Sequence, residues 1–470
     1  MTGDTDFETW LGALLSDGDD RGPAWAVHGQ TVVSREKLRA EVARARGILH
    51  AHGVRAGSTV AVQVLPSFTL LWSLFALWTA GAQVMLLDPR LTAAETTRLL
   101  ELCEPQFRLV SADAAQTFTP FRDECEVVVE RRPLGRPAQG PHRLIQFSSG
   151  STGLPKVIGR TGDSLREEVA RFGQLPDMPG PGEKVLLLSS LAHSFGLIGG
   201  VLHALSAGVV LHFAGSLRAK ELLRIAAEDR VNAVFGVPAH FDLLGRVPAP
   251  PALPDLRLAV SGGELLAAGI HGRFAERYGV RIGQAYGMTE VGIIATDLTG
   301  LAPPPAVGLP VPGMRTAVVD GTLRIRLPEN PYLHADVDDR YVDGWLNTRD
   351  LCAVRPGSGV LEITGRTDTM VAIGGLKVDL TEVEAVLAEH ADVDEVVVVY
   401  GEAVEAHLVV TRDLSRAQLL AWCKERLSPH KIPKAFHFQK ALPRTSNGKL
   451  VRNRELLHTA RERNRRVTIR

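Results

Sequence analysis

The sequence predicts an α/β protein, with a large N-terminal domain of mainly parallel sheets with helices and a small C-terminal α/β domain. With 470 residues, the chain is too long for one compact core. Up to about Asp350, short β-branched runs alternate with helical periods, which indicates βαβ units and a parallel sheet. A turn-rich segment at 355–359 then precedes a compact region. We therefore expect one domain over residues 1–366 and another over residues 367–470.

The first βαβ unit lies in a stretch without charged residues, 56–87. A proline and an Ala-Gly-Ala turn divide it into a strand, a helix and a strand, over 59–64, 68–79 and 83–87. A second uncharged stretch, 185–217, is broken by glycines and predicts short strands on both sides of a helix. Strands buried on both faces are continuously apolar in this way, so neither stretch is expected to span a membrane.

The same alternation continues toward the second domain. We expect a strand, a helix and three further strands, over 209–213, 219–229, 233–237, 256–261 and 360–363. These elements extend the α/β pattern of the N-terminal domain.

The C-terminal domain is predicted from two helix starts and two strands. Asp379 and Glu382 form a capping-box pattern, in which Asp379 accepts backbone N–H bonds and Glu382 reaches back. Ser415 and Gln418 repeat this pattern before a second helix. Runs of β-branched and other apolar residues predict two strands, over 395–400 and 406–411. A small α/β domain of about a hundred residues follows from these elements.

Composition excludes several classes of function. Lys plus Arg and Asp plus Glu both number 53, so no net field attracts nucleic acid or an anionic membrane. The cysteines Cys103, Cys125, Cys352 and Cys423 lack metal-ligand or redox spacing, which fits a reducing compartment and indicates no zinc site. The N-terminus is acidic and polar, unlike a secretory signal. We therefore expect a cytoplasmic protein, with residues 461–470 as a basic, solvated tail.

The segment Phe-Ser-Ser-Gly-Ser-Thr-Gly-Leu-Pro-Lys at 147–156 has the composition of a phosphate-binding loop. Its glycines let backbone N–H groups converge, its hydroxyl groups add donors, and Lys156 supplies positive charge. It is not a Walker A loop, because that motif has a different glycine spacing and a Ser or Thr after the lysine. Here Val157 follows Lys156.

Further polar clusters follow in order along the chain, at 286–290, 345–350, 365–368 and 443–452. With the loop, they resemble the motifs of the adenylate-forming superfamily, which contains acyl-CoA synthetases, aryl-acid ligases, carrier-protein adenylation domains and luciferases. The resemblance runs from the N-terminal region to about Arg454. It implies that ATP and a carboxylic acid give an acyl-adenylate and pyrophosphate, after which a thiol displaces AMP to form a thioester. The implied cofactors are ATP, Mg²⁺ and CoA or phosphopantetheine.

The resemblance also implies roles for individual residues. The implied nucleotide-binding residues are Ser148, Ser149, Gly150, Ser151, Thr152, Gly153, Lys156, Gly262, Gly263, Glu264, Tyr286, Gly287, Asp350 and Arg366. The loop would enclose the β- and γ-phosphates, and Tyr286 would stack on adenine. Thr289 would hydrogen-bond the α-phosphate, and Glu290 would hold Mg²⁺ as a single carboxylate beside phosphate oxygens. Asp350 would accept from the ribose hydroxyls.

The C-terminal domain is expected to be mobile. Lys449 would contact the carboxylate and the α-phosphate during adenylation only, and Asp368 falls at the family's hinge position. When the domain swings about this hinge, Gly374 and Gly375 would frame the passage of the thiol. Glycine suits both a swivel and a narrow passage, although these two could also form a hairpin turn.

His193 matches the position that gates the acyl pocket in fatty-acyl and benzoyl CoA ligases; a satisfied core histidine is the alternative. Aryl-acid ligases that load siderophore carriers have Asn where this chain has Ser194, which gives less support for such a substrate. Residues 156–161 nevertheless resemble the aryl-acid ligases. Amino-acid adenylation domains of the superfamily have an Asp in this region that holds the substrate ammonium. Because no acid lies between Glu183 and Glu221, the resemblance disfavours an α-amino acid. A small aryl or medium acyl acid is expected.

One departure from the family pattern concerns Arg349, where the family usually has Gly before the ribose-binding Asp350. The segment 320–343 is also shorter than in typical members. The leading hypothesis is an acid–thiol ligase that uses CoA or an acyl- or aryl-carrier protein. An amine acceptor without a thioester, and a non-catalytic nucleotide-binding protein, are the alternatives.

Overall fold

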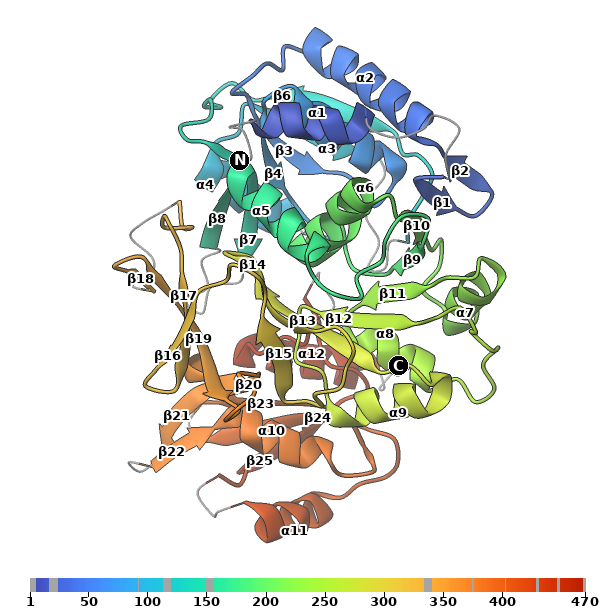
Figure 1. Cartoon of the computed structure of the whole chain (residues 1–470). Helices are drawn as coiled ribbons and strands as arrows, with labels where there is room; N and C mark the ends of the chain where they lie inside the picture. The colour runs from blue at the N-terminus through green and yellow to red at the C-terminus, as the bar shows by residue number, and fades with distance from the viewer. Residues whose placement is uncertain are drawn as a thin grey trace. The chain divides into compact units, whose positions relative to one another are not determined.

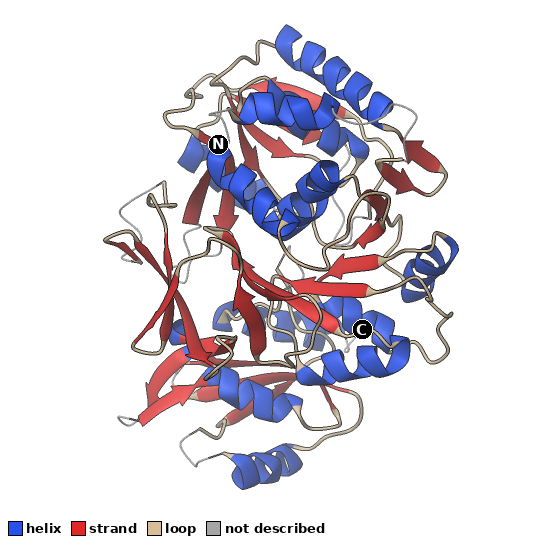
Figure 2. Cartoon of the chain, in the orientation of Figure 1, coloured by secondary structure: helices blue, strands red, loops and turns tan. Residues whose placement is uncertain are grey.

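A computed structural model describes the fold of the chain (Figures 1 and 2). The described residues are 6–16, 24–91, 93–112, 120–148, 156–333, 340–373, 376–401, 403–427, 431–445 and 449–467. The chain forms two compact units. Unit 1 comprises Met1–Thr316, Ile325–Leu346 and Val354–Glu362, and unit 2 comprises Ala317–Arg324, Asn347–Ala353 and Ile363–Arg470. The boundary at 366 and the hinge near Asp368 stay predictions.

The helices are α1 Phe7–Ser16, α2 Arg35–Ala51, α3 Phe68–Thr79, α4 Ala93–Cys103, α5 Gly162–Gly173, the π-helix η1 Phe195–Leu202, α6 His203–Ala207, α7 Ala219–Glu228, α8 Pro238–Gly245, α9 Ala268–Tyr278, the 3₁₀-helix η3 Thr367–Thr369, α10 Leu380–Ala388, α11 Arg416–Arg426 and α12 Arg454–Val467.

The strands are β1 Ala26–His28, β2 Thr31–Val33, β3 Thr59–Gln63, β4 Gln83–Leu86, β5 Phe107–Ser111, β6 Val127–Arg131, β7 His142–Ser148, β8 Lys156–Thr161, β9 Lys184–Leu187, β10 Val210–Phe213, β11 Ala233–Gly236, β12 Leu258–Gly262, β13 Ile282–Met288, β14 Gly292–Asp297, β15 Ala306–Pro310, β16 Thr316–Val319, β17 Thr322–Arg326, β18 Tyr341–Val342, β19 Trp345–Val354, β20 Leu361–Arg366, β21 Met370–Ile373, β22 Leu376–Asp379, β23 Val393–Tyr400, β24 Val404–Val410 and β25 Ala435–Phe438.

The first sheet of unit 1 has the order β6-β5-β3-β4-β7-β8. Its inner strands β5, β3, β4 and β7 are parallel, and β6 and β8 pair antiparallel at its edges. The predicted βαβ unit is confirmed as β3, α3 and β4, with each strand ending one residue earlier than expected. Among the described residues, no helix is both long and apolar enough to cross a membrane.

The second sheet of unit 1 contains the strand order β15-β14-β13-β12-β11-β9-β10-β1-β2. The run from β13 to β1 is parallel, which confirms the predicted α/β class. The predicted helix between β9 and β10 is the π-helix η1, which continues as α6. Gly199 lets η1 pack closely, because a Cβ at this position would lie 2.7 Å from the Phe172 ring.

Alternate residues of the central strands enter two different cores. Leu187, Phe235 and Val260 belong to a large cluster that also contains the apolar residues of α3. Leu186 and Val234 point the other way, into a cluster covered by α7, α8 and α9 (Figure 1). Because both faces of these strands are buried, the strands read as continuous apolar runs in the sequence.

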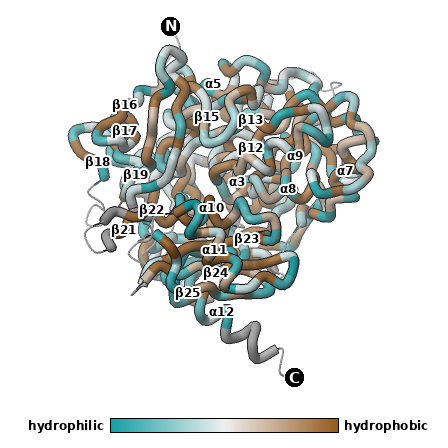
Figure 3. Tube along the Cα trace, turned by 90° about the horizontal axis from the view of Figure 1, so that it is seen from below, coloured by the Kyte–Doolittle hydropathy of each residue, from teal (hydrophilic) through white to brown (hydrophobic). Residues whose placement is uncertain are grey.

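Unit 2 contains the sheet β23-β24-β25 and the hairpin β21-β22. Figure 3 shows hydrophobic residues on β23 and β24 and hydrophilic residues on the described part of α12. The predicted helix starts are confirmed, because Asp379 accepts from the Thr381 N–H at 2.8 Å and Ser415 forms a complete capping box with its third helical residue. The expected return contact of Glu382 is wrong: its carboxylate binds the ammonium of Lys431 at 2.6 Å.

Candidate active site

Several predicted site residues lie at one edge of the second sheet of unit 1. Strands β9, β11, β12 and β13 are parallel neighbours, so their carboxyl ends meet there. His193 follows β9, Gly262 is the last residue of β12, and Tyr286 is near the end of β13. Ligands of open α/β sheets bind at this edge. The fold therefore brings together three motifs that are far apart in the sequence.

The turn after β12 requires glycine twice. Gly263 has φ +86°, in the left-handed region, and a Cβ on Gly262 would lie 2.8 Å from the ring of Phe195. Phe195 itself stacks on Phe235 at a centroid distance of 5.7 Å. This turn thus presents backbone, with the half-buried Glu264 directly after it.

The His193 segment is attached to β7 by a residue that the sequence did not single out, Gln146. Its amide oxygen accepts from the Ser194 hydroxyl at 2.7 Å, and its amide nitrogen donates to the Ala192 carbonyl at 3.0 Å. Gln146 is 2% exposed, so both bonds form away from water, where such bonds matter most. The half-buried His193 is held between these contacts.

Lys156 stands at the base of the predicted phosphate loop. Strands β7 and β8 pair antiparallel as far as Ser148 and Lys156, and the loop residues 149–155 lie outside the described residues. The Lys156 ammonium lies 5.5 Å from the ring centroid of Tyr332, within cation–π range. The antiparallel pairing of Ser148 with Lys156 brings the two ends of this loop together.

Glu290, the predicted Mg²⁺ ligand, lies in the turn between β13 and β14 and is 6% exposed. Its Oε1 accepts from the Tyr332 hydroxyl at 2.8 Å and from Arg340 Nη2 at 2.9 Å. The Arg340 guanidinium carbon also lies 5.1 Å from the Tyr332 ring centroid. A buried carboxylate is therefore stabilised by one cation and one hydroxyl, both missed by the sequence analysis.

Tyr332 reaches this position because its segment runs beside β8. Tyr332 forms an antiparallel bridge with Ile158, and the N–H of Gly159 donates to the Pro331 carbonyl at 2.9 Å. Lys156 at the start of β8 and Glu290 in the β13–β14 turn consequently contact the same tyrosine. No local sequence pattern marks Tyr332, because this role depends on a backbone contact between distant segments.

A buried ion pair supports the turn that carries Glu290. Arg160 Nη2 lies 2.8 Å from Glu168 Oε2, and the two side chains are 2% and 1% exposed. Arg160 also donates to the Thr289 carbonyl at 3.5 Å, and Glu168 accepts from the Ile293 N–H at 3.2 Å. The pair therefore holds the turn on both sides of Glu290.

The Glu168 carboxyl comes very close to the backbone of this turn. Gly292 has φ +85°, and a Cβ there would lie 2.2 Å from the Glu168 carboxyl. Burial raises the pKa of Glu168, and the charge of Arg160 and the Ile293 N–H oppose that rise. Only glycine fits at this position.

Asp350, predicted to bind the ribose, and Arg366, predicted to reach the ribose or phosphate, lie together in unit 2. Arg366 Nη1 donates to Asp350 Oδ1 at 2.6 Å, and Asp350 is 7% exposed. The buried Thr348 hydroxyl accepts from the Asp350 N–H at 3.0 Å, which fixes the strand beside the carboxylate. The nucleotide contacts of both residues stay predictions.

Arg349 has φ +64°, a left-handed conformation that costs an L residue about 1–2 kcal/mol. Glycine adopts it without this cost, which explains physically why the family usually has Gly here. Arg349 in place of the usual Gly therefore brings a strained backbone as well as an added positive charge.

Lys449 is exposed in a hairpin-like segment of unit 2. The Thr445 N–H donates to the Lys449 carbonyl at 2.7 Å, and the Val451 N–H donates to the Pro443 carbonyl at 2.9 Å. Asp368 lies in η3, and the predicted passage residues Gly374 and Gly375 lie outside the described residues.

Comparison with known proteins identifies relatives along most of the chain. A model of the AMP-binding enzyme family matches residues 19–331, and one of the AMP-binding enzyme C-terminal domain matches residues 382–449. Feruloyl-CoA synthases from Amycolatopsis sp and Streptomyces sp are each 29% identical, over 90% of this chain and 94% of theirs. The indoleacetate–CoA ligase of Aromatoleum aromaticum is 28% identical, over 89% and 91%. The resemblance to adenylate-forming enzymes is confirmed.

Solved structures of the same fold cover nearly the whole chain. ATP-bound MatB from Rhodopseudomonas palustris has a TM-score of 0.82 at 21% identity, over 98% of this chain and all of that one (100%). The O-succinylbenzoate CoA synthetase of Bacillus subtilis in complex with AMP has a TM-score of 0.80 at 22% identity, over 95% and 97%. These likenesses confirm the predicted fold class.

We predict that Glu168→Ala lowers the free energy of unfolding by about 3–5 kcal/mol, because Arg160 is then buried without a counter-charge. The double variant Arg160→Met/Glu168→Leu should recover much of this loss. Glu167→Ala, on the exposed face of the same helix, is the control and should cost less than about 1 kcal/mol. Denaturant unfolding measures all three, and a Glu168→Ala loss no larger than the control would contradict the assignment.

The strain at Arg349 predicts that Arg349→Gly is more stable than Arg349→Ala by about 1 kcal/mol. Val354, at the exposed end of the same strand and without a positive φ, should show the reverse order, with Ala favoured over Gly by about 0.5–1 kcal/mol. Thermal unfolding measures the four variants. If Gly and Ala variants ranked in the same order of stability at both positions, the left-handed conformation of Arg349 would be refuted.

Proposed function

The chain belongs to the AMP-binding enzyme family, and on this premise we propose that it activates a small aryl or medium acyl carboxylic acid with ATP and transfers the acyl group to a thiol. The thiol would be that of CoA or of a carrier-protein phosphopantetheine. The observation that supports the proposal most is the position of Lys156 and Glu290 around Tyr332. Both residues contact Tyr332, and a lysine together with a carboxylate that could hold a divalent cation would supply the positive charge that a polyphosphate needs.

The first half-reaction joins a poor nucleophile to a polyanion. A carboxylate oxygen attacks the α-phosphorus of ATP, the bond between the α- and β-phosphates breaks, and pyrophosphate leaves. Lys156 and the adjoining loop would neutralise the β- and γ-phosphates, and Thr289 would donate to the α-phosphate. Tyr286 and the glycine turn at 262–263 would bind the adenine. Such catalysis is positioning plus electrostatics, without an acid–base group.

Glu290 is the residue that would hold Mg²⁺, since a hard cation binds one carboxylate together with phosphate oxygens. When bound, Mg²⁺ would neutralise charge on the phosphates. Arg340 and Tyr332 bind the Glu290 carboxylate in this structure. A divalent cation would therefore share this carboxylate with Arg340 or displace the guanidinium.

The second half-reaction would use the C-terminal unit in a different position. The thiol sulfur attacks the acyl carbon, the bond from acyl carbon to AMP oxygen breaks, and the thiol proton is released. Lys449 would serve adenylation only, and movement at Asp368 would bring Gly374 and Gly375 to the path of the thiol. Asp350 would bind the ribose, and Arg366 would reach the ribose or phosphate. These roles rest on the family resemblance.

The names of the relatives favour an aromatic acid. The feruloyl-CoA synthases and the indoleacetate–CoA ligase are named for acids that carry an aromatic ring, and His193 beside the sheet edge would line the acyl pocket. The relatives named as CoA ligases favour free CoA as acceptor. A carrier protein, an amine acceptor and a non-catalytic nucleotide-binding role remain the competing proposals.

A panel of acids tests the proposed function. Pyrophosphate release is measured with ferulate, 4-hydroxybenzoate, indoleacetate, octanoate and phenylalanine as separate substrates, followed by free CoA, a holo carrier protein or an amine as acceptor. We expect turnover with an aryl or medium acyl acid and none with phenylalanine. If none of the acids gave pyrophosphate release, the enzymatic proposal would be contradicted and nucleotide binding alone would be supported.

We predict that Lys449→Ala lowers the rate of adenylate formation by about 100-fold or more, because one charge opposite the α-phosphate is lost. Thioester formation from pre-made acyl-adenylate should be unchanged. Lys440→Ala, another exposed lysine of the same unit, is the control and should change neither rate. Equal loss of both half-reactions in Lys449→Ala would refute its assigned role.

A further inference from the structure

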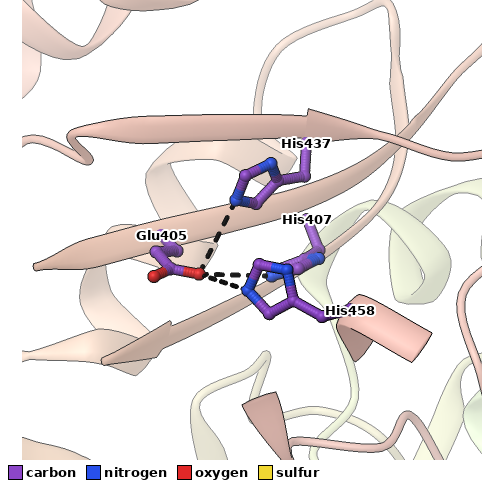
Figure 4. A group of neighbouring side chains, drawn as sticks. All are labelled: Glu405, His407, His437 and His458. Carbon is purple, nitrogen blue, oxygen red and sulfur yellow. Dashed lines mark hydrogen bonds and ion pairs between the residues drawn. The ribbon is translucent and has the colours of Figure 1, made fainter. Parts of the chain in front are cut away.

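Unit 2 contains a cluster of one carboxylate and three imidazoles, formed by Glu405, His407, His437 and His458 (Figure 4). One ligand atom from each residue lies within 4.8 Å of the ligand atoms of the other three. In Figure 4 the three rings point toward the Glu405 carboxylate. This cluster is separate from every residue to which the proposed function gives a role.

The local structure explains why these side chains converge. Glu405 and His407 are two positions apart on β24, so both point to the same face of the sheet. Strands β24 and β25 are parallel, and His407 is the register partner of His437. His458 and Arg454 are four positions apart on α12, so both lie on the helix face that meets Glu405.

The distances suit a four-coordinate ion. Glu405 Oε2 lies 2.8 Å from His458 Nε2, 3.6 Å from His437 Nε2 and 3.9 Å from His407 Nε2. Ligand atoms around a tetrahedral Zn²⁺ at about 2.0–2.1 Å are about 3.3 Å apart. The distances from the carboxylate oxygen to the three imidazole nitrogens lie around this value, and all four ligand atoms lie within 4.8 Å of one another.

Within the described part of the chain, one buried nitrogen of the cluster lacks a hydrogen-bond partner. His407 is 0% exposed, and among the described residues its Nε2 has no hydrogen-bond partner. The buried amide oxygen of Gln439 has none either, while its amide nitrogen lies 2.9 Å from His407 Nδ1. Exchanging the amide oxygen and nitrogen of Gln439 would let Nδ1–H donate to that oxygen and leave the Nε2 lone pair for a metal. The ion would then bind Nε2, and the Nδ1–H would satisfy the amide oxygen of Gln439.

We propose that Glu405, His407, His437 and His458 bind one Zn²⁺ ion in unit 2. Imidazole nitrogens suit Zn²⁺ and similar transition ions, whereas Mg²⁺ prefers oxygen ligands alone. Arg454 Nη2 holds the other carboxylate oxygen, Oε1, at 2.7 Å, and so orients Oε2 toward the imidazoles. Gln439 and Arg454 are the outer residues that fix the ligands.

The ion would fasten α12 to the sheet. His437 is on β25 and His458 on α12, and the chain between them contains Lys449. A metal bound at both ends closes this connection into a loop and stabilises its ends. The site is therefore structural, and it is independent of whether the chain activates an acid.

The test uses the full chain, stripped with a chelator and dialysed, with Zn²⁺ or Co²⁺ as the probe. We expect uptake of one ion per chain, an intense visible Co²⁺ spectrum typical of four-coordinate ions, and a higher melting temperature with Zn²⁺ than with Mg²⁺. No uptake by the wild-type chain, or a weak spectrum typical of six-coordinate Co²⁺, would overturn the proposal.

Variants assign the ligands. His437→Ala, His458→Ala and Glu405→Gln should lose the uptake of Zn²⁺ and the rise in melting temperature. Gln439→Met should weaken binding by about 10-fold or more through the orientation of His407. His390→Ala, another histidine of unit 2, is the control and should bind as the wild type does. Unchanged uptake of Zn²⁺ in the three ligand variants would overturn the assignment. If a variant fails to fold, the Co²⁺ spectrum of the wild-type chain alone decides whether the site is four-coordinate.

Discussion

The ion pair between Arg160 and Glu168 is the interaction on which the proposed site depends. Arg160 is on β8, four positions after Lys156, and Glu168 is on α5. Because both charges are removed from water, each must keep its partner, which fixes β8, α5 and the β13–β14 turn relative to one another. This fixed arrangement positions Lys156 and Glu290, both of which contact Tyr332.

Much of the fold could be predicted from the sequence, since it follows from local rules. The prediction of a strand, a helix and a strand in the uncharged stretch at 56–87 is confirmed by β3, α3 and β4. The helix caps at Asp379 and Ser415 also form as predicted. The predicted return contact of Glu382 was wrong because a distant lysine, Lys431, offers its carboxylate a full positive charge in place of a backbone N–H.

The site could be predicted only where residues form motifs. Glu290, Lys156 and Ser194 belong to such motifs, but their partners Tyr332, Arg340 and Gln146 are single residues brought in by contacts between distant segments. The histidine cluster was missed for the same reason. Glu405 and His407 belong to no metal-ligand motif in the sequence, and only the register of β24 with β25 and the packing of α12 join them to His437 and His458.

The central claim is that Lys156 and Glu290 form one site for the phosphates of ATP, and the exchange of labelled pyrophosphate into ATP tests it most directly. This exchange reports the first half-reaction in reverse and needs no thiol. The account predicts exchange that depends on the carboxylic acid in the wild-type chain and a large loss of it in both Lys156→Met and Glu290→Gln. Exchange at the wild-type rate in either variant would contradict the account.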